Sequence, residues 1–364
     1  MRHRLPLVAV SLAVLPVAAA ARQVPETARD RPAEPRLEIT VDSARHALVV
    51  SVGPLDLPAG ISHHALPQMP VLTGTIPVSV NLYGFRIDLV DGAGGPVPAR
   101  VLHHVNLIDP DHRELFLPIS RRLFAAGEET GDQTMPGWLL GVPLEEGQRL
   151  IVSTMFHNPT DAPYEDVVLR IALLYKPQES VWPILQVYPF QMDVMFPVGD
   201  KSFDLPPGRS QRSYEARPAV AGRILAMGGH MHDLGTALRF EDATTGEVLW
   251  ETKPVTDEEG ELLAIPVGQF WRRLGIPITP EHTYRVTVLY DNPTGDTIAQ
   301  GAMGVVGGVF LPKDPKAWPK PDADDPLYTA DLRHALRLDG GHGDHGDGGH
   351  RMPQKEGAAK SEQG

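Results

Sequence analysis

Alternation of apolar and polar residues with a period of two runs through most of this sequence. The pattern recurs in the segments RLEITVD, HALVVSV, IPVSVNLYGFRIDLVD, RLIVSTMF, VVLRIALLY, TALRFED and YRVTVLY. Turn formers bound these segments, and the chain has 35 glycines and 36 prolines among its 364 residues. Because side chains on a strand alternate between two faces, each segment is predicted to be a strand with one buried face. The sequence therefore predicts an all-β protein built from antiparallel sandwiches of the jelly-roll type.

The strand-rich part of the chain divides into two regions, and its length is sufficient for two domains. The turn-rich segment VGDKSFDLPPGRSQ separates the regions. We predict an N-terminal sandwich over residues 37–197 and a C-terminal sandwich over residues 198–313. Residues 314–364 are predicted to be a linker and a disordered tail rich in histidine, glycine and aspartate.

The two regions also resemble each other. The segments MFHNPTDAP, residues 155–163, and LYDNPTGDT, residues 289–297, both place Asn-Pro-Thr directly after an apolar strand. Each segment follows a histidine pair at a similar interval. We favour the ancestral duplication of a single metal-binding sandwich, and the alternative is the chance recurrence of a turn motif.

An export signal is predicted at residues 1–21. A basic start is followed by an apolar stretch and then by small residues that fit a cleavage site. The apolar stretch is too short to span a bilayer and Pro16 interrupts it, so a membrane anchor is the weaker alternative. We expect a mobile leader over residues 22–36, a periplasmic or secreted location, and no membrane-spanning segment.

The absence of cysteine and the acidic charge exclude several classes of function. A chain without cysteine has no disulfide framework, no zinc–thiolate site and no cysteine nucleophile. The formal net charge of −13 argues against nucleic acid as a partner, because phosphates require basic patches. No Ser-His-Asp order, phosphate-binding glycine loop or carboxylate pair stands out as a rival catalytic motif.

His230 and His232 form the first candidate metal site. Their i, i+2 spacing on a strand places both imidazoles on one face. Met303 lies in a stretch of small residues just beyond the second Asn-Pro-Thr turn. Imidazole suits zinc, copper, iron and nickel, whereas a thioether favours copper. The three residues therefore predict a His-His-Met copper site, and simple packing is the alternative role for the methionine.

His103 and His104 form the second candidate site, and their geometry is harder. Adjacent residues on a regular strand point to opposite faces, so both can bind one metal only at a bulge or a strand end. On a regular strand, one of the two would be a core residue and the other exposed.

Taken together, these features resemble the copper type II, ascorbate-dependent monooxygenases. Peptidylglycine α-hydroxylating monooxygenase and dopamine β-monooxygenase are members of that family. The resemblance runs from about Ile76 to Phe310, and its best stretches are VLHHVNLID, FHNPTD and the passage from DLPPGRSQ through MGGHMHDLG. It implies two copper ions, one in each sandwich.

The resemblance also implies the ligands of both coppers. His103 and His104 correspond to the adjacent histidines of an electron-transfer copper. Its third ligand corresponds to His157 or, in an alignment on the following Asn-Pro, to Met155; these two positions share a strand face, and we favour His157. The ligands of the oxygen-binding copper correspond to His230, His232 and Met303. These three are the predicted catalytic residues.

The implied chemistry is hydroxylation of a C–H bond of a small substrate with O₂. Ascorbate or another one-electron donor would reduce both coppers, which would face each other across a solvent-filled cleft. Gly228 and Gly307 stand where the peptide-hydroxylating member has residues that hold a substrate carboxylate, so a glycine-extended peptide is not expected as the substrate.

Two other hypotheses remain. The first is a non-catalytic copper-binding or copper-delivery protein on the same fold, in which the histidine-rich tail from residue 340 would act as a copper donor. The second is a metal-free interaction module, in which His230 and His232 would lie far from Met303.

Overall fold

A computed structural model of the protein describes residues 34–338, except for 63, 64, 67, 68, 128, 129, 196, 197, 200 and 258–261. The predicted signal peptide, most of the predicted leader and the histidine-rich tail lie outside the described residues. Within the described part, no helix has the length and apolar character needed to cross a membrane.

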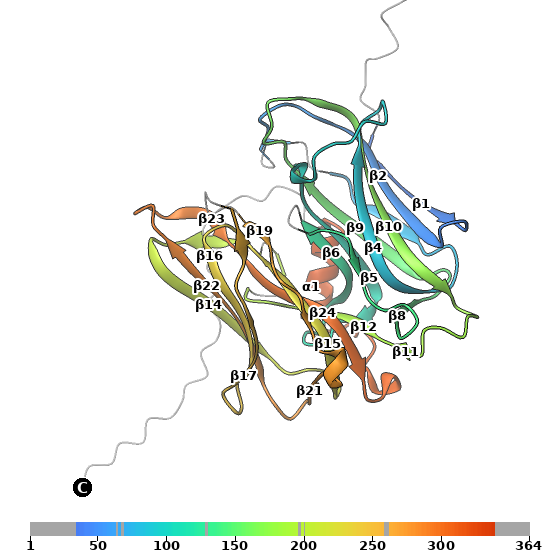
Figure 1. Ribbon diagram of the computed structural model, residues 1–364, viewed down its shortest axis with the longest axis vertical. Coiled ribbons are helices and arrows are strands. Elements are labelled where there is room, and N and C mark those ends of the chain that lie inside the picture. Colours follow the sequence, from blue (N-terminus) through green and yellow to red (C-terminus); the bar gives the residue numbers. More distant parts are fainter. Residues whose placement is uncertain are drawn as a thin grey trace, which may run out of the picture. The chain divides into compact units, whose positions relative to one another are not determined.

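The first sandwich consists of two mainly antiparallel sheets that enclose an apolar core (Figure 1). The larger sheet has the order β1 (Arg36–Asp42), β2 (Ala47–Leu57), β10 (Tyr164–Pro177), β4 (Val80–Val90), β8 (Leu140–Leu144) and β11 (Leu185–Gln186), with β7 (Gln133–Thr134) paired to β4. The smaller sheet has the order β3 (Leu72–Thr75), β9 (Arg149–Phe156), β5 (Leu102–Arg113) and β6 (Ser120–Gly127). The alternating segments of the sequence supply the buried faces, as Val50 and Val52 of β2 illustrate.

The second sandwich is built in the same way. One sheet has the order β12 (Tyr188–Asp193), β24 (Gly304–Pro312), β15 (Gly222–Met231) and β20 (Gly268–Gln269), with β21 (Ile276–Ile278) paired to β15. The other has the order β14 (Gly208–Ala216), β22 (Tyr284–Asn292), β16 (Gly235–Asp242) and β17 (Glu247–Thr252). The pairs β13 (Phe203–Leu205) with β23 (Ile298–Ala302) and β18 (Val255–Thr256) with β19 (Leu262–Ala264) complete it. The all-β prediction of two tandem sandwiches is confirmed.

The two sandwiches repeat one strand order. The sheet β3-β9-β5-β6 of the first corresponds to β14-β22-β16-β17 of the second, and the run β2-β10-β4-β8 corresponds to β12-β24-β15-β20. The strands correspond in chain order as well as in position. This agreement supports the predicted duplication of the scaffold.

The Asn-Pro-Thr turns repeat at the level of single hydrogen bonds. Asn158 and Asn292 are both buried, and each donates its side-chain N–H groups to three backbone carbonyls. Each also accepts hydrogen bonds from the amide and the hydroxyl of the threonine two residues further on. The carbonyl acceptors are those of Leu57, Pro58 and Ala162 for Asn158, and of Leu205, Pro206 and Asp296 for Asn292. The turn is therefore a fixed part of the scaffold, and turn chemistry explains the repeated motif without any metal.

The boundary between the sandwiches differs from the predicted one at residues 197 and 198. Strand β12 begins at Tyr188 and pairs with β24 of the second sandwich. The turn-rich segment that suggested a boundary instead contains β13 and the first residues of β14, inside the second sandwich. The sandwiches also exchange core residues: Leu115 and Ile119 pack in the second core, and Leu225 packs in the first.

Residues 314–338, predicted to belong to a linker and tail, form an ordered strap. Helix α1 (Pro326–Ala335) begins after Asp325, whose carboxylate accepts hydrogen bonds from the first backbone amides of the helix. Asp331 of α1 forms a two-pronged ion pair with Arg122 of the first sandwich, with N···O distances of 2.9 and 2.5 Å. An aspartate N-cap followed by proline is a recognisable helix start, and the linker-like composition of the segment concealed it.

Candidate metal centre

His103 lies at a β-bulge. Leu102 pairs with Phe156 and His104 pairs with Met155, so His103 is an extra residue in β5 between two successive pairs of the ladder. The bulge turns two adjacent histidines toward each other, and their ring centroids are 5.2 Å apart. The prediction that these histidines need an irregular strand in order to converge is confirmed.

His157 follows β9 and stacks against His103 with ring centroids 5.3 Å apart. Its Nε2 lies 2.5 Å from the carbonyl oxygen of Arg100, so Nε2 carries the proton and Nδ1 carries the lone pair that a metal would bind. Burial lowers the pKa of His157, which favours the neutral imidazole that metals require. The alternative ligand Met155 lies opposite His104 in the ladder, so both candidates adjoin the pair.

His230 and His232 lie at the end of β15, with ring centroids 5.4 Å apart. Met231 between them is fully buried in the second core, which places the two imidazoles together on the opposite face of the sheet. His230 pairs with Val305 of β24, and Met231 pairs with Gly304. This arrangement is the same-face geometry that the i, i+2 spacing predicts.

The hydroxyl of Tyr290 brings Met303 to His232. It accepts hydrogen bonds from the backbone N–H groups of His232 and Met303, each at 3.0 Å, and it donates to the carbonyl of Met303 at 2.6 Å. Because both amides lie 3.0 Å from one oxygen, the two nitrogens are no more than twice 3.0 Å apart. Burial raises the pKa of Tyr290 to about 12, so the hydroxyl stays protonated. The wide separation that a metal-free module predicts is not found.

The sequence alone did not single out Tyr290. It stands two residues before Asn292 in an apolar strand and has the pattern of a core aromatic residue. One sequence signal was available, because the repeat has Phe156 at the same place before Asn158. The difference between the two residues is one hydroxyl.

The two histidine sets adjoin each other. The ring centroids of His103 and His232 are 6.2 Å apart. The face of the β12-β24-β15 sheet that carries His230 also carries Val309 and Leu311, which pack against the first core, and so this face is turned toward the first sandwich. The family resemblance predicts a solvent-filled cleft between the two copper sites, whereas the rings of His103 and His232 are close neighbours.

The donor chemistry of the residues fits copper. Five imidazoles adjoin, the backbone of Met303 is joined to that of His232 through Tyr290, and the second nitrogen of His157 has the backbone partner that metal-bound histidines commonly have. Among residues 34–338, where described, no group of three or more His, Asp or Glu side chains already has metal-binding geometry.

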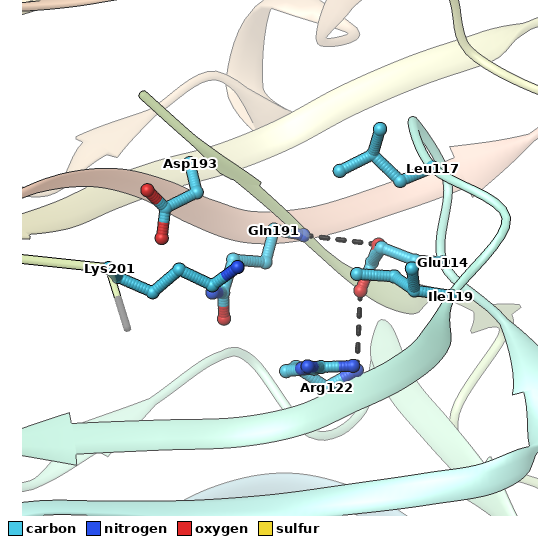
Figure 2. A pocket seen from close by; sticks show the side chains of 7 residues that line it. All are labelled: Glu114, Leu117, Ile119, Arg122, Gln191, Asp193 and Lys201. Carbon is cyan, nitrogen blue, oxygen red and sulfur yellow. Dashed lines mark hydrogen bonds between the residues drawn. The ribbon is translucent and has the colours of Figure 1, made fainter. Parts of the chain in front are cut away.

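A small cavity with several charged residues in its lining lies on the same sheet face (Figure 2). Asp193 of β12 pairs with Val305, which itself pairs with His230, so the three side chains share one face. The cavity volume of about 20 Å³ is enough for one water molecule and too small for an organic substrate. Its lining consists of Glu114, Leu117, Ile119, Arg122, Gln191, Asp193 and Lys201.

The two carboxylates of this cavity differ in their partners. Glu114 accepts hydrogen bonds from the backbone amides of Leu115, Gln191 and Arg122, and it therefore joins the two sandwiches (Figure 2). Asp193 accepts one bond, from the amide of Met195, and its second oxygen has no hydrogen-bond partner in the described structure. Burial raises the pKa of Asp193 to about 6, although the nearby charges of Lys201 and His230 oppose the rise.

Gly228 and Gly307 lie directly opposite each other in the β15–β24 ladder. They share the outer face with His230, which is two residues beyond Gly228. A Cβ atom added at Gly228 would meet Val267 at 3.1 Å, and one at Gly307 would meet only the carbonyl oxygen of Phe190 at 3.4 Å. The strand positions beside the His-His-Met set therefore present backbone and a valine side chain.

No protein-family model matches the sequence, and no curated protein matches it. Among solved structures, the major capsid protein P2 from bacteriophage PM2 is 10% identical, covers 72% of this chain and 98% of its own, and has a TM-score of 0.32. A structure of PNGF-II is 9% identical, covers 72% of this chain and 66% of its own, and has a TM-score of 0.36. At these TM-scores the similarities carry no argument about function.

Proposed function

We propose that this protein is a copper-dependent monooxygenase that hydroxylates a C–H bond of a small substrate with O₂ and a one-electron donor such as ascorbate. The observation that carries the proposal is the meeting of His230, His232 and Met303 at one end of the β15–β24 ladder. The bulged pair His103 and His104 supports it, because a second set of imidazoles adjoins the first. The family resemblance stated above adds to this support.

In this proposal the residues hold two copper ions. His230, His232 and Met303 would hold one, and the thioether would favour its cuprous state. His103 and His104, with His157 or Met155, would hold the other through imidazole nitrogen and that third ligand. When bound, copper would supply the one-electron chemistry that activates O₂. The reaction balances as substrate, O₂, two electrons and two protons giving the hydroxylated product and water.

The substrate class follows from the surroundings of Gly228 and Gly307. No cationic side chain stands at these two positions, and the nearest side chain to Gly228 is Val267. A carboxylate-bearing substrate would find no counter-ion there, so we expect a neutral, largely apolar small molecule. Export to the periplasm or medium and copper donation by the tail belong to the same proposal.

A non-catalytic copper-binding or copper-delivery protein is the second candidate. It is favoured by the size of the cavity at Asp193, on the sheet face that also carries His230, because its volume of about 20 Å³ admits one water molecule. On this alternative the adjoining rings would store or transfer copper without turnover. Both candidates require the same ligands.

Copper loading followed by O₂ consumption separates the candidates. We expect two copper ions per chain and ascorbate-driven O₂ consumption that rises with the right substrate from a panel of neutral molecules. His230→Ala should abolish the substrate-dependent rate, whereas His334→Ala, at an exposed position on α1, should leave it unchanged. Two bound coppers without any substrate-dependent rate would favour the delivery protein. A chain that binds no copper would refute both.

A further inference from the structure

The β15–β24 ladder ends just before two of the predicted ligands. Met231 and Gly304 form its last pair, so His232 and Met303 stand where the regular ladder hydrogen bonds have stopped. Both residues are half-buried, and their backbone N–H and C=O groups still need partners. A buried polar group without a hydrogen bond is costly.

The Tyr290 hydroxyl supplies three of these partners, and the amide of Gly235 donates to the carbonyl of His232. A hydroxyl has one donor hydrogen and two acceptor lone pairs. Tyr290 uses all of them, on the amide of His232 and on the amide and carbonyl of Met303. A single oxygen atom thereby joins the segment that carries an imidazole to the segment that carries the thioether.

The first sandwich provides an internal comparison for this hydroxyl. Phe156 stands two residues before Asn158, as Tyr290 stands two residues before Asn292. Both rings are 2% exposed, and each belongs to the core of its own sandwich. An apolar ring therefore satisfies core packing at this place in the scaffold. The hydroxyl is present in the repeat in which two ligand-bearing segments meet.

We infer that Tyr290 is a positioning residue that fixes Met303 beside His232, so that one thioether and two imidazoles can bind one copper ion. The inference rests on the proposed copper site. Tyr290 does not touch the metal in this role, because its hydroxyl is fully engaged with the backbone of the two ligand residues. Its effect is on the geometry of the soft ligand.

The test is Tyr290→Phe, which gives the second sandwich the aromatic residue that the first already has. Tyr284→Phe is the matched control: Tyr284 is also 2% exposed, stacks on Phe240 in the same core, and accepts one hydrogen bond from the amide of Thr279. X-ray absorption of the cuprous protein detects sulfur bound to copper. Competition with a chromogenic chelator measures the affinity for each of the two cuprous ions.

In the native chain and in Tyr284→Phe, we expect one sulfur ligand for every two coppers. In Tyr290→Phe, we expect the sulfur signal to be lost and one cuprous ion to bind at least tenfold more weakly, with the other unchanged. A Tyr290→Phe protein that keeps both the sulfur signal and the affinity would overturn the inference and leave the copper site standing. A native chain that binds no copper, or binds it without sulfur, would refute the His-His-Met site itself.

Hydrogen exchange in the native, metal-free chain tests the inference without any variant. The amides of His232 and Met303 should be protected, since each donates to a buried hydroxyl. If both amides exchange as fast as the amide of the exposed Gly295, the hydrogen bonds are not maintained and the inference is wrong.

Discussion

The same bulge occurs in both sandwiches, but only the first sandwich carries histidines there. In the first, Leu102 pairs with Phe156 and His104 with Met155, which leaves His103 extra. In the second, Gly235 pairs with Tyr290 and Ala237 with Leu289, which leaves Thr236 extra. His103 and Thr236 are thus equivalent positions of a repeated scaffold. The bulge belongs to the fold, and histidine at the bulge belongs to one copy of it.

The other ligand set shows the reverse difference. His230 and His232 lie at the end of β15, and Met303 directly precedes β24. The corresponding strands of the first sandwich, β4 and β10, contain neither histidine nor methionine. The hypothesis that one metal-binding sandwich was duplicated therefore fits the scaffold and not the ligands. Each sandwich carries its candidate ligands at a place where the other has none.

The second sandwich has a groove at the place that corresponds to the bulge histidines of the first sandwich. Thr236, Leu289 and Asp291 stand where the first sandwich has His103, Met155 and His157, and they help to line a groove of about 490 Å³. Asp291 is paired there with Arg209 at 3.5 Å. The comparison therefore indicates two candidate ligand positions on this scaffold. One is at the bulge, and the other is at the end of the ladder formed by β15 and β24 in the second sandwich.

The largest expected effect comes from replacing the extra residue of one bulge or of the other by alanine. His103→Ala should remove one of the two bound copper ions completely, because that site loses a central imidazole. Thr236→Ala, at the equivalent bulge, should keep both. Copper counted by elemental analysis after dialysis measures the result. Retention of two ions by His103→Ala would show that the bulge histidine is not a ligand.

The repeated asparagines should be alike where the bulges differ. Asn158→Ala and Asn292→Ala each remove, at a buried side chain, three hydrogen bonds to backbone carbonyls and two from the threonine of the turn. We expect each variant to lose about 3 kcal/mol of the free energy of unfolding in urea. Asp161→Ala, at an exposed position of the first turn, should lose less than about 0.5 kcal/mol. A large inequality between the two asparagines would contradict the equivalence of the turns.

A smaller effect is expected from the pH dependence of Asp193. Burial raises its folded pKa from 3.8 to about 6, so this carboxyl stabilises the fold most below pH 3.8 and the contribution is lost as the pH rises through about 6. A shift of this size corresponds to a few kcal/mol at most, since one pKa unit is about 1.4 kcal/mol. The charged groups around it are Lys201, His230 and Arg122, with Glu114 in the same cavity.

Urea unfolding between pH 4 and 7 checks this dependence as a difference between the native chain and Asp193→Asn. The native chain should lose stability relative to the variant as the pH rises. Asp242→Asn is the matched control in the same sandwich, because the pKa of Asp242 is shifted in the opposite direction. The hydrogen bond between Asp242 and His282 contributes to lowering it. A difference that does not change with pH would show that Asp193 is not the group that titrates.

Local patterns predicted what depends on a strand's own periodicity. The alternation of apolar residues gave the sandwiches, the i, i+2 spacing gave the shared face of His230 and His232, and the adjacent histidines called for a bulge. The role of Tyr290 could not be predicted, because it depends on the hydrogen bonds that its hydroxyl forms with His232 and Met303 at the end of the β15–β24 ladder. The early start of β12 escaped because six residues between turn formers carry too short a pattern to assign to either sandwich.

The exchange of core residues has a consequence for how the chain can be divided. A fragment that ends before β12 would keep the strands of the first sandwich, but the segment around Phe116 would lack the second core that buries it. The strap adds a second dependence, because Arg121 of the first sandwich lies over the rings of both Tyr188 and Trp318, at 5.2 and 4.7 Å. Each sandwich therefore buries apolar side chains that the other supplies, and a fragment with one sandwich alone would expose them to solvent.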